Sequence, residues 1–228
     1  MNALPYTLIP VLAVLVGAAV ALIRKPDAAL VSGMQHLAAG VVFAAAATEV
    51  LPPVLHGASA WATMLGGALG VAVMLFLKSL EGRAAGRMTF LAAIGIDMFI
   101  DGLVLGLSFL AGAQAGLLLT IALTLEVLFL GLTLTAEQQG SVNSRLRILL
   151  TIGMVALLLP LGALVATPVG HLSPVMITAF LAFGLMALLY LVTEELLIEA
   201  HEHPDSPLIT AMFFVGFLGL VLLEENMR

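Results

Sequence analysis

Apolar segments of about 20 residues recur along the whole chain, and this pattern constrains the fold more than any other feature, because a helix of that length spans the hydrocarbon core of a bilayer. Hydrophobic residues make up 62% of the 228 residues and charged residues 10%, which is more apolar surface than a water-soluble domain of this length can bury. The sequence therefore predicts an all-α, polytopic membrane protein with eight transmembrane helices. The predicted segments cover residues 5–23, 33–54, 60–78, 89–111, 115–136, 146–166, 174–198 and 207–224.

The linkers between the segments are short, and several contain residues that end helices, such as Pro52-Pro53 and Pro204. No linker is long or biased enough in composition to separate domains, so we expect one bundle over residues 1–228. The sequence contains no cysteine, which excludes disulfides and thiolate metal ligands.

Positive charges gather in alternate linkers, which predicts how the chain is oriented in the membrane. The charges on one side are Arg24, Lys25, Lys78, Arg83, Arg87, Arg145 and Arg147, and the charge on the other is Arg228. Because cytoplasmic loops carry the excess of lysine and arginine, these linkers are expected in the cytoplasm. Both termini are then extracytoplasmic.

Two aspartates lie four residues apart in the fourth segment, within Gly95-Ile-Asp-Met-Phe-Ile-Asp-Gly102. In a helix this spacing stacks Asp97 and Asp101 on one face. Glu126 lies near the middle of the fifth segment, which is an antiparallel neighbour joined by a short linker. Counting from the segment ends puts all three acids near the middle of the bilayer, so we expect them to converge between two adjacent helices.

A charge at this depth costs about 2.5–3.5 kcal/mol on insertion scales, so chains rarely keep one there without a partner. Three carboxylates cannot all stay ionised in a dry pocket without a cation or protons. The sequence favours a cation site, or a proton relay, with an all-oxygen coordination shell. The alternative is that protonated acids hydrogen-bond the helices together.

Further acids and histidines lie near the segment ends, where they are candidate ligands on the way into or out of such a centre. Glu49, near the outer end of the second segment, is either a vestibule ligand or an interfacial residue that reaches water. His36, near the inner end of the same segment, is either a ligand that faces the seventh segment or a packing residue.

The seventh segment ends in Thr193-Glu-Glu-Leu-Leu-Ile-Glu-Ala-His-Glu-His203, where Glu195, Glu199 and His203 share one helical face. Oxygen and imidazole ligands arranged in this way suit a divalent transition ion. The alternative is an ordinary solvated helix end. The candidates in this stretch are Glu194, Glu195, Glu199, His201 and His203.

Three stretches match motifs of a known family. The second segment runs from His36-Leu-Ala-Ala-Gly-Val to Leu51-Pro52, similar to a span that contains AAGV and ends in LLP. Leu159-Pro-Leu-Gly-Ala163 is similar to an EPxGA element, and the stretch 193–201 to SEELxPEAH. Taken together, nearly the whole chain resembles the ZIP (Zrt/Irt-like) divalent metal-ion transporters, which have eight spans with both termini extracytoplasmic.

In that family an HNxPEG motif on the fourth span and a related motif on the fifth build a binuclear metal centre. The resemblance implies that Asp97 and Asp101 replace the histidine and glutamate of the first motif, and that Glu126 keeps a ligand position in the second. It therefore implies at most one metal site, built of carboxylates. The apolar residues at family ligand positions are Met98, Val127, Leu130 and Leu159, and those replacing the motif prolines are Ile100 and Phe129.

The resemblance implies a single transport domain that moves a divalent metal across a bacterial inner membrane toward the cytoplasm by alternating access. The substrate would be zinc, manganese, iron or cadmium, and an oxygen-only shell favours harder cations such as manganese. The expected partners are the lipid bilayer and the cation; a homodimer is compatible with the sequence, and nucleic-acid binding is not expected.

Two alternatives remain open: a ZIP-fold protein whose reduced site binds or senses metal without transport, and one that moves another cation, such as protons. No nucleophile–base pair or nucleotide motif is found, so an enzyme is not expected.

Overall fold

The computed structural model describes residues 3–24, 26–82, 87–138, 144–202 and 206–227, and all regular structure in these ranges is helical. Eight helical spans within them are long and apolar enough to cross a membrane, which confirms the number of segments predicted from the sequence. Single helices form five of the spans: α1 (Leu4–Ile23), α4 (Ala60–Gly82), α5 (Arg87–Ala111), α6 (Ala113–Gln138) and α11 (Pro207–Met227).

The second, sixth and seventh spans are composite. The second consists of α2 (Ala28–Ala45), η1 (Ala46–Val50) and α3 (Leu51–Leu55); the sixth of α7 (Arg145–Ala156) and α8 (Leu158–Val169); the seventh of α9 (Pro174–Leu191), η2 (Val192–Leu196) and α10 (Leu197–His201).

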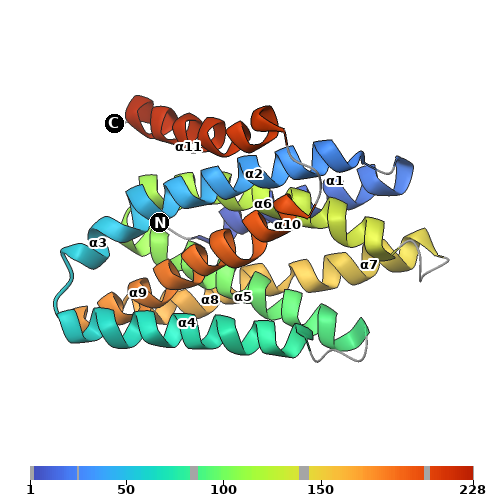
Figure 1. Cartoon of the computed structure of the whole chain (residues 1–228). Coiled ribbons are helices and arrows are strands. Elements are labelled where there is room, and N and C mark those ends of the chain that lie inside the picture. Colours follow the sequence, from blue (N-terminus) through green and yellow to red (C-terminus); the bar gives the residue numbers. More distant parts are fainter. Residues whose placement is uncertain (1–2, 25, 83–86, 139–143, 203–205, 228) are drawn as a thin grey trace.

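The most extensive contacts join helices that are not neighbours in the sequence (Figure 1). α1 packs against α6, α2 against α11, α4 against α9, and α5 against α8. α5 is central, because 78% of its most apolar stretch is buried, compared with 17% for α11. Large apolar side chains such as Leu12, Trp61 and Leu218 are exposed on the outside of the bundle, as expected for a surface that contacts lipid.

Glycines allow close backbone contact in each of these four helix pairs. A Cβ atom would overlap backbone atoms of the partner helix at Gly17 of α1, Gly40 of α2, Gly66 of α4 and Gly102 of α5. Small residues permit this approach in a membrane, where packing takes over the role that the hydrophobic effect has in water. The contact at Gly102 fixes α5 against the backbone of α8 at Leu159.

The sixth span is broken at Leu157, between α7 and α8. Pro160 is the third residue of α8, and since it has no N–H it cannot complete a helical bond to the carbonyl of Ala156. By contrast, α5 and α6 run uninterrupted through Ile100 and Phe129. The acids predicted to form the central site therefore lie on regular α-helices.

The second and seventh spans each contain a widened π turn. The N–H of Leu51 bonds to the carbonyl of Ala46, and the N–H of Leu197 bonds to that of Val192, five residues earlier in each case. Such a turn changes the direction of the side chains around it, and π turns frequently occur at functional sites. η1 contains Glu49, and η2 contains Glu194 and Glu195.

We expect Gly40→Ala to destabilise the protein by about 1–3 kcal/mol, the usual cost of overpacking, because the new methyl group would overlap the backbone of α11 at Phe213. The matched control is Gly219→Ala in α11, where a Cβ would meet no atom within 4 Å. The measurement is the thermal unfolding midpoint in detergent. Equal midpoints for the two variants would contradict the close contact between α2 and α11.

Candidate metal centre

Asp97 and Asp101 on α5 and Glu126 on α6 come together inside the bundle. Each offers one carboxylate oxygen, and the three oxygens lie within 4.8 Å of one another. Asp101 and Glu126 are only 2% and 4% exposed, and Asp97 is partly buried. Both buried acids lie near the middle of the apolar spans Leu91–Ala111 and Ala113–Ala136. In the part of the chain that the structure describes, this is the one group of three such residues with metal-ligand spacing.

Two buried oxygens of this cluster, Asp101 Oδ2 and Glu126 Oε2, have no hydrogen-bond partner among the described residues. Leaving a buried polar atom unsatisfied costs about 1–3 kcal/mol, and more for a charged group. The nearby like charges add repulsion, because the surroundings are poorly polarisable. A bound divalent cation would supply both the missing partner and the opposite charge.

A small cavity of about 40 Å³ lies beside the cluster. A cavity of at least about 10–15 Å³ can hold a water molecule, so this space is large enough for water or a single metal ion. Its polar lining consists of Gln35, Asp97, Glu126, Thr133, Glu195 and Glu199. The remaining walls are apolar and come from Phe129, Leu130, Leu191 and Leu196.

Glu195 is a fourth carboxylate, which lines the cavity beside the cluster. The sequence predicted it as an exit ligand at the cytoplasmic end of the seventh segment, whereas in the structure it lines the same cavity as Asp97 and Glu126. It is close enough to interact electrostatically with both Asp101 and Glu126. Because Glu195 lies within the π turn η2, its direction could not be derived from a regular helical period.

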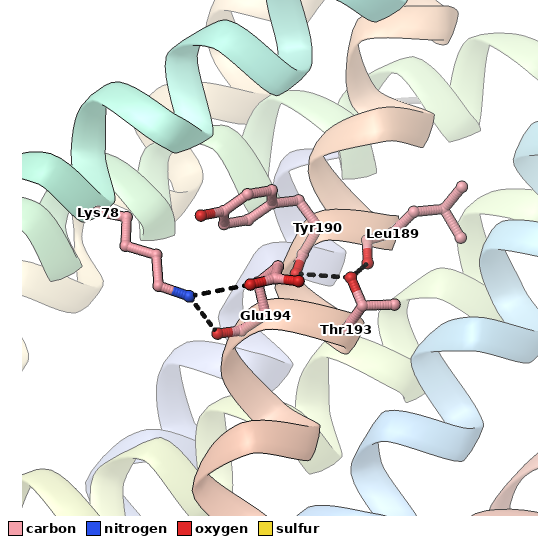
Figure 2. A network of polar contacts seen from close by, with 5 residues as sticks. All are labelled: Lys78, Leu189, Tyr190, Thr193 and Glu194. Carbon is pink, nitrogen blue, oxygen red and sulfur yellow. Dashed lines mark hydrogen bonds and ion pairs between the residues drawn. The ribbon is translucent and has the colours of Figure 1, made fainter.

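Glu194, the preceding residue, turns instead toward Lys78 of α4 (Figure 2). Lys78 Nζ lies 3.2 Å from Glu194 Oε2 and donates a 2.8 Å hydrogen bond to the backbone carbonyl of the same residue. The ammonium also lies 5.6 Å from the centre of the Tyr190 ring, and the Thr193 hydroxyl donates to a carbonyl one turn earlier. These contacts hold the π turn so that Glu194 pairs with α4 while Glu195 lines the cavity.

Gln35 was not predicted as a site residue, although a glutamine in a long apolar span is itself a signal. Gln35 Nε2 donates a 2.7 Å hydrogen bond to Glu199 Oε2. One turn earlier, the Ser32 hydroxyl donates a 2.7 Å bond to the carbonyl of Ala200. These two bonds join α2 to α10 at the cavity.

The histidines predicted as candidate ligands differ in their burial. His36 on α2 is 2% exposed, and its ring contacts that of His201 on α10 with a centroid distance of 4.9 Å. His201 itself is exposed. His203 lies outside the described residues.

Glu49 lies apart from the carboxylate centre, in a separate cleft of about 310 Å³. This cleft is also lined by Glu224 of α11, and by Ala111 and Gln114 at the turn between α5 and α6. Ala111 is ten residues beyond Asp101 on the same helix, a distance of about 15 Å at 1.5 Å per residue. Glu49 is therefore not a ligand of the central cluster in this conformation.

Three of the four apolar residues that the sequence resemblance puts at ligand positions are packed in the core. Met98 is 2% exposed, and Val127 and Leu159 are fully buried. Leu130 instead lines the cavity beside Glu126. These side chains offer no oxygen or nitrogen ligand, so the carboxylates make up the polar part of the centre.

Comparison of the sequence with protein-family models finds no match, and comparison with curated proteins finds no significant match. The fold and the site themselves define the class: a multi-pass, all-helical protein of the membrane-spanning type with a buried carboxylate cluster.

We expect Asp101→Asn to stabilise the metal-free protein, by about 0.5–2 kcal/mol, since it removes one of four neighbouring carboxylates and functional clusters are commonly destabilising. The measurement is the thermal unfolding midpoint in the presence of a chelator, with Glu225→Gln at the exposed end of α11 as the control. A lower midpoint for Asp101→Asn would mean that the acid joins helices as a hydrogen-bonding group.

Proposed function

We propose that this chain is a divalent-metal transporter of the ZIP type in a bacterial inner membrane. The observation that carries the proposal is the convergence of Asp97, Asp101 and Glu126 within 4.8 Å at the middle of two membrane-spanning helices. Ionisable residues at this depth are rare and commonly mark the pathway of an ion. The sequence resemblance to ZIP transporters supports the same function.

The metal is the substrate, and Asp97, Asp101 and Glu126 are its proposed ligands. Glu195 lines the same cavity, and in this proposal it joins them when the metal moves. Because the shell consists of oxygen atoms, manganese and iron(II) are favoured over softer ions. Three carboxylates also carry more negative charge than one divalent ion neutralises, so a proton or the positive ends of nearby dipoles would balance the remainder.

The proposed route runs from the cleft at Glu49 through the central cluster to the end of α10. At the cavity, the hydrogen bond between Gln35 and Glu199 closes the route between α2 and α10. Opening this contact would expose the cluster toward the cytoplasm, and Glu199 would then be free of Gln35 to accept the ion. In the alternating-access cycle, this opening follows closure of the outer cleft.

A second candidate function is metal binding or sensing without transport. The observation that favours it is the burial of Met98, Val127 and Leu159, which leaves a reduced centre. Both functions predict metal binding at the cluster, so only a flux measurement separates them.

Reconstituted liposomes provide that measurement. We expect uptake of manganese, iron or another divalent ion by the wild-type protein, and a loss of at least about tenfold in Asp97→Ala and Asp101→Ala, because each removes a direct ligand. Glu225→Gln is the control for expression and reconstitution. Unchanged uptake in both aspartate variants would overturn the proposed transport site, and binding without uptake in the wild type would favour the sensor.

The proposed orientation has a separate test, which the absence of native cysteine makes simple. His171→Cys and Ser206→Cys place single thiols at exposed positions in successive linkers. With both termini extracytoplasmic, a membrane-impermeant maleimide added to intact cells should label His171→Cys, whereas Ser206→Cys should react only after permeabilisation. The reverse pattern would invert the proposed orientation.

A further inference from the structure

We propose that His36 and His201 form a second metal site, made of nitrogen ligands, that takes a borderline transition ion such as zinc, cobalt or nickel. The site lies between α2 and α10, outside the carboxylate cluster, and it does not depend on transport. The observations that carry it are the tautomers of the two rings, their separation and the burial of one unpartnered ring nitrogen.

The hydrogen bonds of the two histidines assign the same tautomer to both. His36 Nδ1 lies 2.9 Å from the carbonyl oxygen of Ser32, and His201 Nδ1 contacts the carbonyl oxygen of Leu197. A carbonyl can only accept, so each Nδ1 carries a proton and donates it. In a neutral imidazole the lone pair is then on Nε2. Metal-binding histidines are commonly held in this way, with the second ring nitrogen donating to a backbone carbonyl.

His36 Nε2 is buried and has no hydrogen-bond partner among the described residues. A buried acceptor without a donor costs about 1–3 kcal/mol, so its presence in an otherwise well-packed region calls for a partner. His36 is 2% exposed, which leaves little room for bulk water to fill this role. A metal ion held jointly with His201 would satisfy this nitrogen.

The spacing of the rings suits one shared ion. Their centroids are 4.9 Å apart, and the ring planes are inclined by 62°. Two imidazoles that bind one tetrahedral ion at about 2.0–2.1 Å per nitrogen have their centroids roughly 5 Å apart. The observed separation of the centroids agrees with this value, and the Ser32 and Gln35 hydrogen bonds hold α2 against α10 at this point.

The position of the pair also gives an ion access from water. His201 is exposed at the end of α10, whereas His36 is buried. His36 directly follows Gln35, which lines the carboxylate cavity. Both histidines thus belong to the same two helices, α2 and α10, as the hydrogen-bonded pair Gln35 and Glu199 at this cavity.

Nitrogen ligands give the pair a selectivity that differs from that of the central cluster. Imidazole suits zinc, copper, nickel and cobalt, whereas carboxylates alone suit manganese and magnesium. The two sites can therefore be separated by choice of metal.

The test is a cobalt titration of the purified full-length protein in detergent, followed by visible absorption and by calorimetry. To isolate the histidine pair, the titration uses the double variant Asp101→Asn/Glu126→Gln as background. We expect this background to keep a cobalt site with nitrogen-ligand absorption bands, and His201→Gln or His36→Gln to weaken it by at least about tenfold. Because His201 is exposed, its replacement tests the site without disturbing the core.

His56→Gln is the matched control, since His56 makes the same type of bond, from Nδ1 to the carbonyl of Pro52 at 2.8 Å, at an exposed position. It should bind cobalt as the background does. Cobalt binding unchanged in His201→Gln and His36→Gln, or no binding in the background, would overturn the histidine site and leave the carboxylate centre unaffected. Loss of manganese binding by Asp101→Asn/Glu126→Gln tests that centre separately.

Discussion

Repulsion between carboxylates in an apolar interior is the constraint on which the rest of the structure depends. Asp101 and Glu126 are almost completely buried, and Asp97 and Glu195 line the same region. Such a cluster is stable only if the helices that carry it cannot move apart and if something neutralises it. The first condition is met by packing: Gly102 fixes α5 against α8, and Gly131 fixes α6 against α1 through backbone contacts. The second is the physical reason to expect a bound cation.

The seventh span adds further acidic and histidine side chains next to the three central carboxylates. The π turn η2 separates two adjacent glutamates, so that Glu194 pairs with Lys78 while Glu195 lines the cavity. One turn further, Glu199 is bonded to Gln35 of the second span, and His201 contacts His36. Carboxylate oxygens near the middle of the bundle thus give way to imidazole nitrogens toward the end of α10. If both proposed sites bind metal, an ion that moved from one to the other would meet a change in ligand chemistry beside the hydrogen bond between Gln35 and Glu199.

Much of this arrangement could be predicted from the sequence, because it depends on regular helices. Eight apolar segments predicted the eight spans, and the spacing of Asp97 and Asp101 together with the depth of Glu126 predicted that the three acids meet. What could not be predicted depends on departures from regularity. A π turn has no clear sequence signature, so the sequence predicts Glu195 at the end of its span and not beside the central acids. Gln35 enters the site through the packing of α2 against α10, which sequence spacing does not specify.

The central claim is that the carboxylates of α5 and α6 hold a metal ion, and anomalous diffraction from crystals soaked with manganese tests it most directly. The account predicts an anomalous peak within about 2.0–2.6 Å of oxygens from Asp97, Asp101 and Glu126, the range for hard cations bound by oxygen. It also predicts that Asp101→Asn crystals lose this peak. Manganese peaks elsewhere on the protein, with none at this cluster, would contradict it.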